Sequence, residues 1–101
     1  MKELIGTAPL YPTVTKEQID SVITAIDYHV FPNTTVTICL LTLENGFTVT
    51  GESACADPRN FDKFKGEYYA LEDAKNKIWR LEGYLLRQRL HESAKLEGEG
   101  K

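Results

Sequence analysis

Apolar residues between positions 14 and 31 recur at steps of three and four residues, which predicts a helix near the N-terminus. Thr15 and Gln18 have the spacing of a capping box at its start, and Pro32 follows its end. The apolar stripe consists of Ile19, Val22, Ile23, Ile26 and Val30. We therefore expect a helix over residues 14–31, preceded by an N-terminal arm of residues 1–13.

The run TTVTICLLTL, which starts at residue 34, is rich in β-branched and aliphatic residues. Asn45-Gly46 follows it and favours a two-residue type I′ turn, which predicts a β-hairpin over residues 34–52 with position 44 facing position 47. One face of this hairpin carries Leu40, Thr42, Phe47 and Val49. The other carries Cys39, Leu41, Leu43, Thr48 and Thr50. Because both faces hold apolar groups, one would cover the helices and the other needs a further layer, for which a second subunit is the simplest candidate.

The rest of the chain divides into a polar loop over residues 53–65, a long helix over residues 66–95 and a polar tail over residues 96–101. The apolar stripe of the long helix consists of Leu71, Ala74, Ile78, Leu81 and Leu85. The predicted fold is a single α+β domain with an N-terminal helix, an antiparallel β-hairpin and a long C-terminal helix, assembled as an oligomer.

Composition and charge narrow the class of protein. The chain has 101 residues, 42% of them hydrophobic and 27% charged, which suits one globular domain. Neither a secretory signal nor a stretch long enough to span a bilayer is evident, so we expect a cytoplasmic protein. Cys39 and Cys55 are too few for a disulfide framework, and we expect both to be reduced.

Catalytic and metal motifs are lacking: we find no Gly-rich phosphate loop, no paired histidines at metal spacing and no Gly-x-Ser-x-Gly. We therefore expect a binding protein without enzymatic activity, metal or cofactor. The net charge of −3 disfavours general nucleic-acid binding, although the C-terminal helix is locally basic.

A second stripe on the long helix is the strongest candidate for a binding site. It consists of Asp73, Lys77, Arg80, Tyr84, Arg87 and His91. Guanidinium groups hold phosphates through paired N–H donors and an aromatic ring stacks on a base, so the stripe suits a phosphorylated nucleotide. The alternative is an ordinary solvated helix face, which most stripes of this kind are. The loop Asp57-Pro58-Arg59-Asn60-Phe61 can add a stacking ring and an amide, or Phe61 can instead fill the core while Asn60 closes a turn.

The segments NGFTVTGES, ACADPRNF and KIWRLEGYLL, within residues 36–90, resemble a family of small phage and prophage proteins that includes the Thoeris anti-defence one family. Such proteins bind and sequester the cyclic ADP-ribose-type messenger of bacterial TIR-domain defence proteins without cleaving it, and some also bind cyclic di- or trinucleotides as hexamers. The resemblance implies a homodimer or homohexamer, with pockets between subunits, in the cytoplasm of an infected bacterium.

Position by position, the resemblance implies contacts from Asn60 and Phe61 in the loop and from the polar helix face. With the residues argued from chemistry, the candidate ligand-binding set is Arg59, Asn60, Phe61, Asp73, Lys77, Arg80, Tyr84, Arg87 and Arg89. A competing hypothesis is a protein-interaction module in which Trp79, Tyr84 and the apolar hairpin face dock a host protein.

Overall fold

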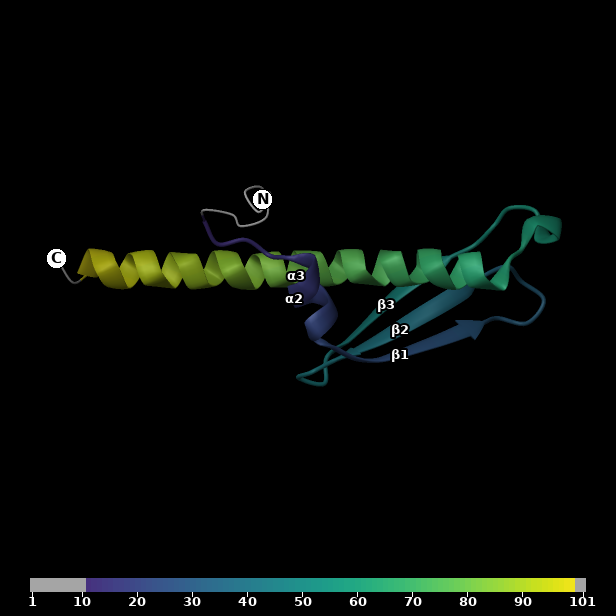
Figure 1. Ribbon diagram of the computed structural model, residues 1–101, viewed down its shortest axis with the longest axis horizontal. Coiled ribbons are helices and arrows are strands. Elements are labelled where there is room, and N and C mark those ends of the chain that lie inside the picture. The colour runs from purple at the N-terminus through teal and green to yellow at the C-terminus, as the bar shows by residue number, and fades with distance from the viewer. Residues whose placement is uncertain (1–10, 100–101) are drawn as a thin grey trace, which may run out of the picture.

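The computed structural model describes residues 11–99, and its layers are a three-stranded antiparallel sheet and one long helix (Figure 1). The strand order is β1-β2-β3. The elements are α2 (Lys16–Ser21), β1 (Ile23–Val30), β2 (Thr37–Leu43), β3 (Thr48–Ser53), the 3₁₀ turn η1 (Pro58–Asn60) and α3 (Lys63–Glu99). The α+β class, the N-terminal helix, the hairpin and the long C-terminal helix are confirmed. Most of the predicted arm, residues 1–10, and the end of the predicted tail, residues 100 and 101, lie outside the described residues.

The predicted helix over residues 14–31 is wrong in its second half. It starts as expected, with the Thr15 side chain accepting a hydrogen bond from the N–H of Gln18 at 3.1 Å, but it ends at Ser21. Residues 23–30 form β1, which pairs antiparallel with β2. The sequence ITAIDYHV is rich in β-branched and aromatic residues, and β2, buried at every second position, is a central strand whose backbone needs a partner on each side. Tertiary pairing therefore overrides the helical spacing.

The turn of the hairpin contains three residues rather than two. The N–H of Leu43 donates to Phe47 O at 2.8 Å, and Gly46 takes the positive φ of 89° that closes a three-residue loop. The register is therefore shifted by one residue from the predicted one, with Leu41 opposite Val49. Since one residue of slip moves a side chain to the other face, Val49 lies in the core with Leu41 rather than with Leu40.

The core lies between the sheet and the N-terminal half of α3. Its buried members are Ile19, Cys39, Leu41, Leu43, Val49, Ala70, Ala74 and Ile78. Gly51 of β3 sits so close to α3 that a Cβ at this position would overlap Ala70 O and Ala74 N. The strand and the helix are thus in backbone contact at this point. Burial raises the pKa of the Cys39 thiol, which agrees with the structural role expected for it.

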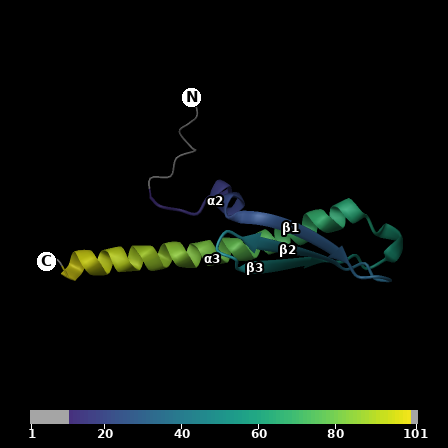
Figure 2. The ribbon, with the colours of Figure 1, turned by 90° about the horizontal axis from the view of Figure 1, so that it is seen from below.

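The α3 helix is longer at both ends than the predicted 66–95 segment. It begins at Lys63 because Asp62 Oδ1 accepts hydrogen bonds from the N–H groups of Phe64 and Lys65, at 3.0 and 3.1 Å. Its 37 residues extend to Glu99, about 55 Å, and the C-terminal half passes beyond the sheet (Figures 1 and 2). All residues from 89 to 96 are exposed. No helix within residues 11–99 has a stretch long and apolar enough to cross a membrane.

Asp20 anchors α2 to α3. Its carboxylate accepts hydrogen bonds from Lys75 of α3 and from Lys16 of its own helix, each at 3.0 Å. These two bonds hold the pKa of Asp20 below its ordinary value of 3.8, and the bond from Lys75 has the larger effect. A lowered pKa in the folded state means that the ionised carboxylate stabilises the fold above that ordinary value. This stabilisation disappears as the pH falls through the folded-state pKa.

We expect Asp20→Asn to lower the melting temperature near neutral pH, by a small amount because Asp20 is exposed. The difference from the wild type should shrink as the pH falls below 3.8 and vanish once the pH is below the lowered folded-state pKa, where both side chains are neutral. Thermal melts of the two proteins across this range provide the measurement. A difference that stays constant or grows in acid would contradict the assignment.

Candidate functional site

Two of the predicted site residues, Asp73 and Lys77, are bound to the outer edge of β3. Asp73 Oδ2 accepts the N–H of Glu52 at 3.0 Å, and Lys77 Nζ donates to Thr50 O at 2.6 Å. Both side chains therefore hold α3 against the sheet. Each keeps capacity for a ligand, because an ammonium has three donors and a carboxylate has several lone pairs.

The hydrogen bond from the N–H of Glu52 to Asp73 should contribute to the stability of the fold. Asp73→Ala leaves the exposed N–H of Glu52 to water in place of its acceptor and should lower the free energy of unfolding by about 0.5–1.5 kcal/mol. Asp73→Asn keeps an oxygen acceptor at the same place and serves as the matched control. Chemical denaturation of the three proteins is the measurement. Equal losses in the two variants would show that the charge of Asp73, and not its bond to β3, supports the fold.

A groove runs between the hairpin and the middle of α3, and we call it the helix–hairpin groove. Its lining includes two cations, two aromatic rings, one acid and a leucine: Lys77, Arg80, Phe47, Tyr84, Glu82 and Leu81. Two adjoining hollows of about 410 and 220 Å³ form it, joined at Phe47 and Leu81. Phe47 is 55% exposed and Tyr84 is 70% exposed, so both rings are available to a ligand. Within the described part of the chain, Lys77 and Arg80 form no ion pair.

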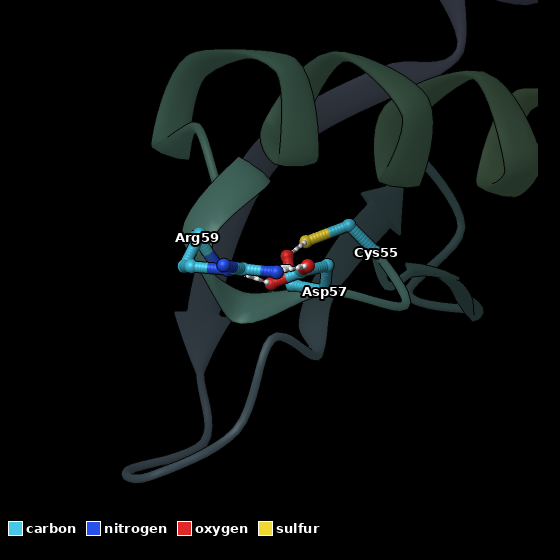
Figure 3. A network of polar contacts seen from close by, with 3 residues as sticks. All are labelled: Cys55, Asp57 and Arg59. Carbon is cyan, nitrogen blue, oxygen red and sulfur yellow. Dashed lines mark hydrogen bonds and ion pairs between the residues drawn. The ribbon is translucent and has the colours of Figure 1, made fainter.

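The second candidate region is the loop before α3, where Arg59 is paired with Asp57 (Figure 3). Arg59 Nη2 and Asp57 Oδ2 are 2.7 Å apart, and Asp57 Oδ1 also accepts the backbone N–H of Arg59 at 2.9 Å. The side-chain bond lowers the pKa of Asp57 and raises that of Arg59. Cys55 Sγ donates to the carbonyl oxygen of Asp57 at 3.4 Å. Arg59 therefore stabilises η1 in this structure and is not directed at a pocket.

Phe61 lines two hollows beside this loop, and Asn60 lines the smaller of them. The smaller, of about 210 Å³, lies against the start of α3 and contains Lys65 and Tyr69 beside Asn60 and Phe61. The larger, of about 620 Å³, opens between Phe61 and the loop from β1 to β2. The predicted ring and amide thus face solvent-accessible hollows, with a cation nearby. Phe61 is 36% exposed, so it does not fill the core.

The loop hollows and the helix–hairpin groove are separate sites within one chain. Lys77 lies about 20 Å along α3 from its first residue, and Arg87 about 35 Å. Arg87 is exposed on the helix half that passes the sheet. Arg89 belongs to a different hollow, on the side of α2, with Gln18 and Glu82. The nine predicted residues therefore do not converge on one pocket of a single protomer.

Sequence reasoning missed three residues of these sites. Phe47 was assigned to a hairpin face, whereas the three-residue turn leaves its ring exposed beside Lys77 and Arg80. Lys65 and Tyr69 were treated as parts of a loop and a helix without a role. A signal was available for Phe47, since an aromatic residue directly after a turn seldom has a full set of packing neighbours.

The architecture defines a small α+β protein with an uncovered length of helix and two candidate sites, the smaller loop hollow and the helix–hairpin groove, each of which combines an aromatic ring and a cation. Residues 14–90 match the phage protein (N4 Gp49/phage Sf6 gene 66) family. Because the match covers most of the chain, the protein belongs to that family. Searches of curated proteins and of solved structures found no match.

Proposed function

We propose that this phage-family protein binds a cyclic nucleotide immune messenger of the bacterial host, of the cyclic ADP-ribose type, and sequesters it without cleaving it. The observation that carries the proposal is the helix–hairpin groove, where Lys77 and Arg80 lie beside Phe47 and Tyr84. Family membership and the resemblance of residues 36–90 to the Thoeris anti-defence one family agree with it.

The chemistry of such a messenger matches the groove. Its diphosphate needs cationic N–H donors, which Arg80 and the two remaining donors of Lys77 supply. Its base needs an aromatic face, which an exposed Phe47 or Tyr84 offers. Asp73, next to Lys77, can accept a bond from a ribose hydroxyl. Binding without hydrolysis is part of the proposal, and recovery of the intact ligand tests it.

An oligomer would unite the separate sites. The half of α3 beyond the sheet exposes Leu90 and Leu96, at 41% and 68%, and a single exposed helix of this kind is weakly stable alone. Packing of this segment on a second subunit would bury the leucines. It would also let the Phe61 loop of one subunit approach the cationic stripe of another. The outer sheet face gives less reason for an oligomer than α3 does, because its strands carry only Ile38 and Leu40 as large apolar residues.

The test is a depletion experiment with a panel of cyclic ADP-ribose isomers and cyclic di- and trinucleotides. The protein is mixed with each compound, the free ligand is quantified, and the protein is then denatured by heat. Sequestration predicts that one class of compound disappears from solution and returns intact after denaturation. Failure to deplete any compound would overturn the proposal, and recovery of an altered compound would make the protein an enzyme.

A second candidate function is docking to a host protein, and one observation favours it. The first turns of α3 expose Phe64, Tyr68 and Tyr69, at 78%, 58% and 60%. Clustered exposed aromatic residues are typical anchors of protein interfaces. Under this hypothesis Phe64→Ser abolishes inhibition of the host and leaves messenger binding in the groove unchanged, which separates the two functions.

A further inference from the structure

The two edges of the sheet differ in how they are covered. At β3, Asp73 and Lys77 take up the outward N–H of Glu52 and the outward carbonyl of Thr50. At β1, no segment of residues 11–99 pairs with the outward side, because β1 is the first strand in the order β1-β2-β3. An uncovered strand edge is a template for pairing with another chain.

Apart from the acid Asp27, the β1 strand also lacks the features that usually block an edge. Its eight residues include no lysine, arginine or proline, and its one irregularity lies at its start, between Ile23 and Ala25. Ile26 and Tyr28 are 45% and 37% exposed although they belong to the sheet face that packs on α3. A regular edge of this length with exposed apolar side chains is suited to a partner strand.

The hydrogen-bonding pattern between β1 and β2 shows which backbone N–H and C=O groups of β1 are free. Phe31 donates its N–H to Val36 O at 3.1 Å, in the same register as the rest of the β1–β2 ladder. Bonded and non-bonded pairs alternate along an antiparallel ladder, so the odd-numbered residues of β1 bond to β2. The N–H and C=O groups of Ile26, Tyr28 and Val30 therefore point to the free edge.

We propose that β1 pairs antiparallel with β1 of a second copy of this chain, with Tyr28 opposite Tyr28 at a twofold axis, to form a six-stranded sheet. In this register Ile26 lies opposite the partner's Val30, and Asp27 lies opposite the partner's His29. The segment IDYHV is thus self-complementary, reading apolar, acid, aromatic, base, apolar. A twofold interface requires this property of a strand that pairs with itself.

The backbone and the side chains agree on this register. The outward groups of Ile26, Tyr28 and Val30 are the ones that meet, which gives about six main-chain hydrogen bonds. Asp27 and His29 fall at the closer, non-bonded positions, where a carboxylate can accept an imidazole N–H. Other registers that keep the twofold axis place Asp27 against an apolar residue or against itself. The interface does not depend on what the protein binds.

Hydrogen exchange resolved by residue tests the pairing directly. The amides of Ile26 and Tyr28 have no acceptor in β2, so in the assembled protein they should exchange about 100-fold or more slowly than in an unpaired strand. Free exchange of these amides at concentrations where the protein is assembled would overturn the proposal. Protection that persists in a dilute monomer would also overturn it, because the edge would then be covered by the same chain.

A charge swap provides the second test. His29→Asp places like charges opposite each other twice per interface and should raise the dissociation constant about tenfold, measured by sedimentation equilibrium. Asp27→His combined with His29→Asp again places an acid opposite an imidazole and should return the constant to within about threefold of the wild type. Thr48→Asp, on the same sheet face but in β3, is the matched control and should have no effect. A double variant no better than His29→Asp would contradict the register.

Discussion

Gly51→Ala is expected to lower the free energy of unfolding by about 3 kcal/mol or more. The new Cβ would overlap Ala70 O and Ala74 N, and both atoms belong to the backbone of α3, which cannot rotate away as a side chain can. The helix must therefore move off the sheet at the centre of the core. Chemical denaturation followed by circular dichroism measures the loss.

Gly83→Ala is the matched control for this prediction. A Cβ at position 83 meets nothing within 4 Å, and the residue lies in the middle of α3. Because alanine is a better helix former than glycine, this variant should be more stable than the wild type by about 0.5–1 kcal/mol. A Gly51→Ala protein as stable as Gly83→Ala would show that β3 and α3 are not in the close contact described.

Arg80→Gln is expected to weaken messenger binding by about 10- to 100-fold while leaving the fold intact. The substitution removes a charge-assisted contact to phosphate, worth about 1.5–3 kcal/mol. Arg80 is exposed in the helix–hairpin groove, so its loss opens no cavity in the core. Isothermal titration calorimetry with the messenger identified by the depletion panel gives the ratio of dissociation constants.

Lys95→Gln is the matched control for Arg80→Gln. It removes one positive charge from the same helix at an exposed position outside the groove. The net charge of the two variants is identical, so a general electrostatic effect would weaken both equally. Equal affinities in the two variants would place the phosphate site elsewhere than the groove.

Much of the fold could be predicted from local patterns. The capping box at Thr15 marks the start of α2, and the β-branched run from residue 34 marks β2. The end of α2 could not be predicted in this way, because Val22, Ile23, Ile26 and Val30 satisfy a helical period while their residue types equally favour a strand. Residues 23–30 form a strand because β2 has an edge that needs a pairing partner, and this need depends on the tertiary structure.

The predicted register of the hairpin is wrong for a different reason. Asn45-Gly46 is compatible with a two-residue turn and with a three-residue turn that places Gly46 at positive φ. Packing selects the second, because only that register puts Val49 beside Leu41 in the core. The error moved Phe47 and Val49 to the wrong face and so concealed the part that Phe47 plays in the groove.

The candidate site was predictable in its chemistry and not in its geometry. Helical spacing correctly places Lys77, Arg80 and Tyr84 on one side of α3, since that depends only on the period of the helix. It cannot reveal that Lys77 also bonds to β3, or that Arg59 is occupied by Asp57. Nor can it reveal that the loop before α3 is far from the polar stripe in the middle of that helix. Those facts depend on how segments distant in sequence meet.

Native mass spectrometry of the protein with the panel of cyclic nucleotides tests whether an oligomer of this protein sequesters a messenger, because it reports the ligand, its integrity and the subunit count together. We expect an oligomer that carries the intact mass of one class of cyclic nucleotide, with Arg80→Gln carrying markedly less. A protein that remains free of every nucleotide of the panel up to high micromolar concentrations would contradict it.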